Sequence, residues 1–227
     1  MQEYETEEQQ VEAIKKWFKE NGSFLIWTVI VSVAMVSVVK YWYHHQEVVR
    51  LEASESYSAM LFAANQDDLA TADSKANALI EKHSGTTYAD LATLYQAKMA
   101  VSAKDLDLAV NYLQQVIEQS KVVDLQYIAK ARLARIKLAQ GKPNEALTLF
   151  DAPKESSYFT LLQELKGDAL LALNKPAEAK IAYQLAFEAV DEMQRPILKL
   201  KLEELGGLQE QHSSIVSKEE PQNTEIS

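Results

Sequence analysis

An uncharged run of sixteen residues, from Phe24 to Val39, constrains the fold of this chain more than any other feature. Together with Lys40 and the three aromatic residues after it, the run forms an apolar and interfacial stretch that ends at Tyr43. A helix rises about 1.5 Å per residue, so twenty residues span about 30 Å, the thickness of a bilayer core. A buried core helix is the alternative, but such helices rarely lack a polar face so completely. The sequence therefore predicts a transmembrane helix over residues 24–43.

The residues around this span bear on its processing and its orientation. A cleavable signal peptide needs a short basic segment before the apolar run, whereas residues 1–23 carry six Glu and three Lys. No A-x-A cleavage motif follows the run, so we expect a retained anchor. Three Lys precede the span, against Lys40 and Arg50 after it, which favours a cytoplasmic N-terminus. Residues 44–205 would then lie outside the cytoplasm, which in a bacterium is the periplasm.

The segment before the span has a helical pattern of its own. Four apolar residues at helical spacing alternate with three lysines: Val11, Ile14, Trp17 and Phe18 with Lys15, Lys16 and Lys19. One interpretation is an amphipathic helix on the anionic cytoplasmic leaflet, ending at Asn21-Gly22. The other is a solvated segment without stable structure, and the residues leave both open.

The region after the span contains an internal repeat. The run GKPNEA at residues 141–146 recurs 33 residues later as NKPAEA at residues 174–179. Each run has a residue that tolerates a left-handed conformation, followed by a Pro suited to the first turn of a helix. Ala134 and Gly167 match at the same period. The pattern indicates repeated helix–turn–helix units.

Further positions keep step with this repeat. Phe150 matches Tyr183, and an upstream copy has Ala97 as its small residue, 37 residues before the next copy. A small residue lets the two helices of a hairpin approach closely, and the larger one packs against the neighbouring unit. A period near 34 with this content is typical of tetratricopeptide repeats. The chain resembles the tetratricopeptide-repeat (TPR) family over residues 90–126 and 127–190, although it lacks the Trp near the start of each repeat.

Three further segments complete the predicted architecture. Residues 48–83 predict one more helical pair, and a helix from about Met193 to Leu205 would cover the last repeat, as solenoids require. Residues 206–227 have almost no apolar content, so we expect them to be disordered. The predicted fold is all-α, with a single N-terminal transmembrane helix followed by a TPR-like helical solenoid.

Composition and motifs argue against catalysis and metal binding. The chain has no Cys, which excludes disulfides, thiolate metal sites and Cys nucleophiles, and its formal charge of −10 argues against a nucleic-acid partner. His44 and His45 lie past the membrane interface, where adjacent side chains diverge on a helix and solvation explains them better than a metal. No phosphate loop, G-x-S-x-G or H-E-x-x-H motif occurs. We therefore expect a protein that is not an enzyme and that has no cofactor.

In TPR proteins the first helix of each pair lines a concave groove that binds polypeptides. Carried over position by position, this pattern predicts a mostly aliphatic groove with a few charges of mixed sign, suited to apolar or extended segments. Some of these leucines would instead be core if their side chains pack between helices. The predicted lining is Leu91, Leu94, Lys98 and Val101 in the first copy, Ile128, Ala131, Arg135 and Leu138 in the second, and Leu161, Glu164, Asp168 and Leu171 in the third.

The whole layout resembles the ancillary subunit of the bacterial Sec translocon, the YfgM-like family. The resemblance rests on these runs: Tyr4-Glu5, QVEAIKKWF at 10–18, ENG at 20–22, Tyr41-Trp42, His45-Gln46, ARLAR at 131–135 and LKGDALL at 165–171. It implies an inner-membrane protein with a cytoplasmic N-terminus and a periplasmic TPR domain. It also implies association with the translocon channel and a membrane-anchored prolyl-isomerase-like chaperone, helping exported polypeptides to reach periplasmic chaperones. A structural TPR scaffold for another cell-envelope assembly is the alternative.

Overall fold

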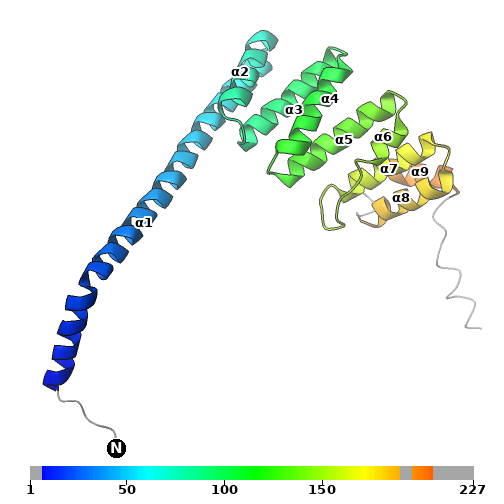
Figure 1. The fold of residues 1–227 in the computed structure, drawn as a ribbon. Helices are drawn as coiled ribbons and strands as arrows, with labels where there is room; N and C mark the ends of the chain where they lie inside the picture. Colours follow the sequence, from blue (N-terminus) through cyan, green and yellow to red (C-terminus); the bar gives the residue numbers. More distant parts are fainter. Residues whose placement is uncertain (1–6, 190–195, 207–227) are drawn as a thin grey trace, which may run out of the picture. The chain divides into compact units, whose positions relative to one another are not determined.

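The computed structural model describes residues 7–189 and 196–206, and this part of the chain is helical without strands. The all-α prediction is therefore confirmed. The C-terminal segment after Gly206 lies outside the described residues. The helices, shown in Figure 1, are α1 (Glu7–Asn65), α2 (Leu69–Lys82), α3 (Thr87–Ser102), α4 (Leu106–Gln119), α5 (Val123–Ala139), α6 (Pro143–Leu147), α7 (Phe159–Ala172), α8 (Pro176–Glu188) and α9 (Pro196–Glu204).

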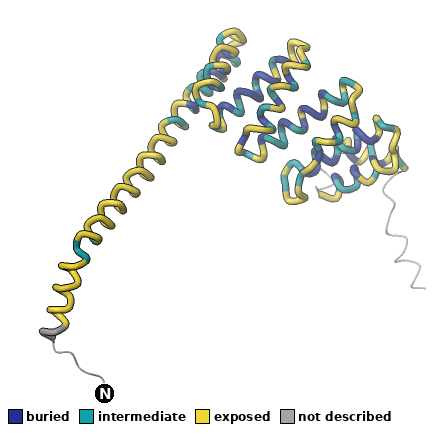
Figure 2. Tube along the Cα trace, in the orientation of Figure 1, coloured by how far each residue is buried: buried dark blue, intermediate teal, exposed yellow. Residues whose placement is uncertain are grey.

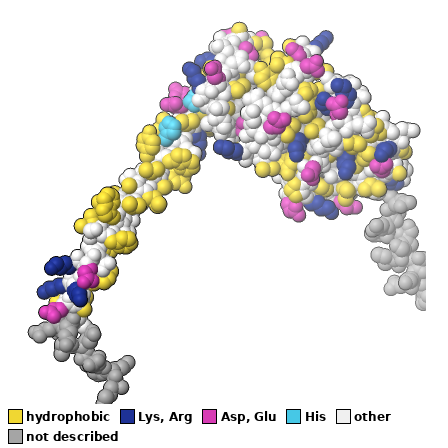
Figure 3. All heavy atoms as spheres, in the orientation of Figure 1, with side chains coloured by type: hydrophobic (Ala, Val, Ile, Leu, Met, Phe, Trp, Pro, Cys, Tyr) yellow, Lys and Arg dark blue, Asp and Glu magenta, His cyan; other side chains and the backbone are white. Residues whose placement is uncertain are grey.

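The chain divides into two compact units, Met1–Glu55 and Ser56–Ser227. In the first unit, α1 is long and apolar enough to cross a membrane, and none of its apolar window is buried. Hydrophobic side chains cover this stretch, while charged side chains gather toward its N-terminal end (Figure 3). A helix of this composition that is exposed on every side needs an apolar solvent.

Polar side chains within the predicted span are satisfied by the helix itself. The hydroxyls of Thr28, Ser32 and Ser37 each donate to the carbonyl oxygen four residues earlier, at 2.9, 2.7 and 2.8 Å. Hydrocarbon offers no hydrogen-bond partners, so these internal bonds allow the three residues to lie at membrane depth.

Neither interpretation of the segment before the span is fully correct, because the segment is helical but does not end at Asn21-Gly22. Helix α1 continues through both residues, and the Asn21 side-chain amide donates to the carbonyl oxygen of Trp17 at 3.0 Å. Gly22 is not among the described residues with positive φ, so it does not form a left-handed helix end. Lys19 and Glu20 before the pair are good helix formers, and the apolar residues after it are also helical, so the turn expected from Asn-Gly does not form.

In the second unit, four turns with the same geometry each join the two helices of a pair. Their left-handed residues are Asp67, Lys104, Gly141 and Asn174, with φ between 58° and 71°. In each turn the next backbone N–H donates to the carbonyl oxygen five residues earlier, at 2.9 to 3.1 Å, which closes the preceding helix in a Schellman motif. The end of α1 with α2 is therefore the first of four pairs, as the sequence predicted for residues 48–83, and α9 follows the last pair.

The third pair, α5 with α6, differs in length from the others after its turn. Helix α6 ends at Leu147, whereas α8 continues to Glu188. Pro153 prevents this segment from continuing as far as α8 does, because proline cannot continue a helix and disfavours helical conformation in the residue before it. Phe150 therefore lies beyond α6 rather than within a helix as Tyr183 does, yet both side chains are buried.

From α3 onward, the interior of the second unit contains three adjoining clusters of buried residues. The first joins α3, α4 and α5, the second α5, α6 and α7, and the third α7, α8 and α9. Figure 2 shows buried residues along the facing sides of these helices. Helix α9 contributes Leu198 and Leu202 to the third cluster, so it covers the last pair as a capping helix.

Candidate functional site: the exposed face of the first helices

The small residues predicted at the hairpin contacts are buried. Ala97 is 2% exposed and Ala134 is 0% exposed, and Gly167 also lies in the interior. At Gly167 an added Cβ would overlap the ring of Tyr183, so only glycine fits there while the ring keeps its place. These contacts set the rotation of α3, α5 and α7 about their axes, and with it the face that each helix leaves open.

The structure separates the predicted groove residues into two groups. Leu94, at 4% exposure, and Ala131 belong to core clusters, which differs from their predicted place in the lining. The reason is that a first helix packs against the next pair as well as its own partner, so two of its faces are covered. Four more residues pack partly against the core: Leu91, Ile128, Leu138 and Leu161.

The exposed members of the predicted set are Lys98, Val101, Arg135 and Leu171. Three of them lie together at a hollow of about 310 Å³ between α3 and α5. Two cations and one apolar residue from the prediction are therefore neighbours in space. The hollow is lined by Ala97, Lys98, Val101, Ser102, Leu113, Arg132, Arg135 and Ile136.

Arg132 and Ile136 belong to this hollow but were absent from the predicted lining. Arg132 Nη1 donates to the carbonyl oxygen of Leu94 at 3.4 Å, which links α5 to α3. With Arg135 these residues have the spacing i, i+3 and i+4, which places them on one helix face. That spacing was the available signal, but the TPR register pointed to Ala131 instead.

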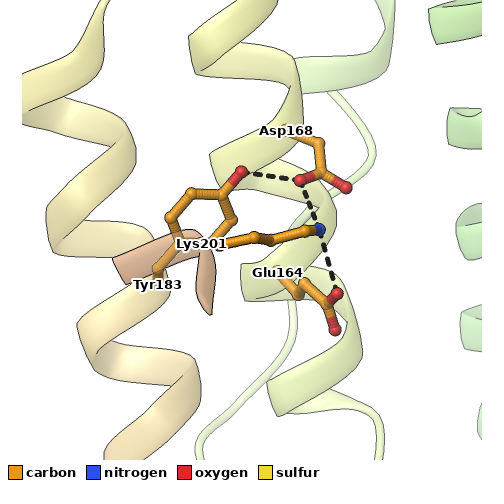
Figure 4. A network of polar contacts seen from close by, with 4 residues as sticks. All are labelled: Glu164, Asp168, Tyr183 and Lys201. Atoms are coloured by element: carbon orange, nitrogen blue, oxygen red, sulfur yellow. Dashed lines mark hydrogen bonds and ion pairs between the residues drawn. The ribbon is translucent and has the colours of Figure 1, made fainter. Parts of the chain in front are cut away.

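The acidic members of the predicted set have partners from the same chain. Lys201 of α9 lies between them (Figure 4), with its Nζ 3.0 Å from Glu164 Oε1 and 2.6 Å from Asp168 Oδ1. Tyr183 of α8 donates its hydroxyl to Asp168 Oδ1 at 2.6 Å. The Lys201 ammonium also lies 5.4 Å from the centroid of the Tyr183 ring. Three helices thus meet at one polar network.

Burial and charge act together on this network. Burial raises the pKa of Tyr183, and the hydrogen bond to Asp168 raises it further, so its hydroxyl stays protonated and donates. Burial lowers the pKa of Lys201, but hydrogen bonds to Asp168 and Glu164 outweigh it and the net shift is upward. Lys201 is therefore cationic at neutral pH, and the network holds α9 against α7 and α8.

Among residues 7–189 and 196–206, no group of three or more His, Asp or Glu could hold a metal ion. The candidate site therefore consists of exposed cations and apolar side chains on the first helices of the pairs. In α7, the carboxylates of Glu164 and Asp168 form an acidic patch that Lys201 covers. Such a surface can bind a chain segment by contact and charge.

Comparisons with known proteins extend over most of the chain. A family model described as "Tetratricopeptide repeat-like domain" matches residues 15–207. A protein of Aggregatibacter actinomycetemcomitans named "Ancillary SecYEG translocon subunit" is 33% identical over 199 residues, which is 88% of this chain and 97% of that protein. Proteins with the same name from Haemophilus influenzae and Escherichia coli are each 30% identical, over 88% and 81% of this chain and 97% and 88% of their own lengths. No solved structure matches the chain.

The repeated helix pairs, their common turn and the small residue in each first helix define a tetratricopeptide-repeat scaffold, on a chain with a helix that can cross a membrane. The family match and the relatives agree with this class. The chain belongs to the family of TPR-like ancillary SecYEG translocon subunits. The resemblance derived from its N-terminal and repeat motifs is confirmed.

Proposed function

We propose that this protein is a non-enzymatic adaptor of the bacterial inner membrane that associates with the Sec translocon. The similarity to proteins named ancillary SecYEG translocon subunits, over nearly their whole length, carries this proposal. Its TPR-like domain would bind a membrane-anchored prolyl-isomerase-like chaperone and newly exported polypeptides, and pass these polypeptides to periplasmic chaperones. Solenoids of this kind offer extended surfaces for such contacts.

The proposed topology places residues 24–43 across the lipid bilayer, the N-terminus in the cytoplasm and residues 44–205 in the periplasm. The exposed apolar surface of α1 and the three lysines before the span support it. A reporter that fluoresces only in the cytoplasm, fused after residue 205, should stay dark. Bright fluorescence, or a mature protein that lacks residues 1–40, would contradict the topology.

The proposed binding surface is the open face of the first helices. Lys98, Arg135 and Leu171 would contact a partner directly, because their side chains are exposed. The other members of the proposed set would shape this face by packing or by charge: Leu91, Leu94, Leu138, Glu164 and Asp168.

The test is a pull-down of the full chain after extraction of membranes with a mild detergent. Copurification of translocon channel subunits is the expected result. Recovery of envelope-synthesis or division proteins in their place would support a structural scaffold of another assembly and would contradict the proposal. A variant in which residues 24–43 are replaced by an unrelated transmembrane segment separates the contributions of the two parts.

A further inference from the structure

Three cations without acidic partners surround the hollow between α3 and α5. Lys98, Arg132 and Arg135 line it, and no carboxylate lines it with them. Within residues 7–189 and 196–206, none of the three lies within ion-pair distance of a carboxylate. This concentration of positive charge contrasts with the formal charge of −10 on the whole chain.

In the third repeat, the charge at the equivalent helix position is neutralised by an ion pair. Asp168 occupies the position of Lys98 and Arg135 in its own repeat, and Lys201 of α9 supplies the opposite charge at 2.6 Å. Glu164 receives the same ammonium at 3.0 Å. In the third repeat, a neighbouring helix of the same chain thus covers this position and supplies the opposite charge. In the first two full repeats no described element does so.

The floor of the hollow is apolar. Three of its lining residues, Ala97, Leu113 and Ile136, are buried, whereas Val101 and the three cations are exposed. Apolar contact there favours burial of an aliphatic side chain, at about 25 cal/mol per Å² removed from water. Two guanidinium groups at the rim match carboxylates in geometry as well as in charge.

We infer that this hollow binds an extended acidic segment of a partner polypeptide, in which carboxylates flank an aliphatic residue. The aliphatic side chain would contact Val101 and Ile136, and the flanking carboxylates would pair with Lys98 and Arg135. Flanking side chains of an extended segment point away from the aliphatic one, and the exposed side chains of Lys98 and Arg135 are long enough to reach their carboxylates beside the segment. The inference deepens the proposed function, on which it rests only for the use of this face in binding.

The probe is a short fluorescent peptide of alternating glutamate and valine, and its match replaces every glutamate with glutamine. Binding to the full chain in an uncharged detergent is measured by fluorescence anisotropy. The acidic peptide should bind about tenfold more tightly than its match, since it makes more than one ion pair. Raising the ionic strength should narrow this difference.

Substitutions locate the binding site. Lys98→Gln and Arg135→Gln should each weaken binding of the acidic peptide about threefold to fivefold, and leave the neutral peptide unchanged. Lys175→Gln is the matched control: it removes the same charge from an exposed side chain at the start of α8, outside the hollow. Equal binding of the two peptides, or an equal loss in the Lys175 variant, would overturn the inference.

The remaining outcomes separate this inference from the proposed function. If the acidic peptide binds only after deletion of residues 207–227, which include four Glu, the occupant is a segment of this chain and not a partner. Competition by vesicles of anionic lipid, together with equal binding of the two peptides, would assign the cations to a membrane surface and overturn the inference. A chain that copurifies with the translocon but does not prefer the acidic peptide contradicts only the inference. A chain that prefers the acidic peptide but does not copurify with the translocon contradicts only the proposed function.

Discussion

Replacing Gly167 with alanine tests the contact between α7 and α8, the fourth helix pair. An added Cβ overlaps the ring of Tyr183, which is 0% exposed and whose hydroxyl is bonded to Asp168. Because the ring is buried and its hydroxyl is hydrogen-bonded, it cannot easily move away from the added methyl group. We therefore take the loss of stability at the upper end of the range for overpacking, about 3 kcal/mol. Alanine is the better helix former, which returns about 1 kcal/mol. The variant should therefore be destabilised by about 2 kcal/mol.

Urea unfolding of the full chain in detergent, followed by far-ultraviolet circular dichroism, measures this loss. In thermal unfolding the same change corresponds to about 4–8 °C for a domain of this size. Gly22→Ala is the matched control, since nothing lies within 4 Å of the position and the residue is also helical. It should leave the unfolding midpoint of the repeat domain unchanged.

A second background distinguishes overlap with the ring from other causes. In a Tyr183→Leu chain the overlapping ring atoms are absent, so Gly167→Ala should be neutral or stabilising there by up to about 1 kcal/mol. The two substitutions would then show a coupling free energy of about 2–3 kcal/mol. If alanine at Gly167 costs nothing in the wild-type background, or costs the same in both backgrounds, the reasoning is refuted.

Three further substitution or fragment experiments test the rest of the structure. Lys201→Met should destabilise the domain by about 1–2 kcal/mol at neutral pH, because two carboxylates lose their partner. The raised pKa of Lys201 in the folded state stabilises the fold below the ordinary lysine pKa, and this stabilisation is lost as the pH rises through the raised value. The difference in unfolding free energy between wild type and variant should therefore shrink at alkaline pH, and a constant difference would contradict the prediction. Leu94→Ala should cost about 2–4 kcal/mol in chemical unfolding, and Leu171→Ala, at an exposed position, under about 0.5 kcal/mol; similar losses would refute the division between core and open face. A fragment of residues 48–227 should be soluble, highly helical and cooperative in its melting, and a gradual loss of signal would contradict an independent repeat domain.

Much of the architecture could be predicted because it depends on local signals. The apolar run marks α1, and Gly-Lys-Pro and Asn-Lys-Pro mark two of the four turns. The other two turns have Asp67 and Lys104 in the left-handed position. Asp adopts this conformation more readily than most residues, whereas Lys gives no such signal, so only the backbone geometry reveals the turn at Lys104. At Asn21-Gly22 the local signal was misleading, because this turn-forming pair lies inside a continuous helix.

The groove was predicted less completely, for a reason of packing. Register along a helix follows from the sequence, and it placed Lys98, Arg135 and Asp168 at equivalent positions. Whether such a position is open depends on which helix packs beside it. Val101 is 44% exposed, whereas Leu138, at the equivalent position of the next repeat, packs partly against the core.

The sequence by itself determined the helix that can cross a membrane, the helical repeat and the family, because hydrophobic runs, turn residues and small-residue spacing act over short distances. Only the tertiary structure decided which charges have partners. Lys201 lies 33 and 37 residues from Asp168 and Glu164 along the chain, and the fold brings all three together. The same packing leaves Lys98, Arg132 and Arg135 around one apolar hollow. Charge pairing and exposure depend on neighbours that are distant in the chain, and only the packed arrangement of the helices supplies them.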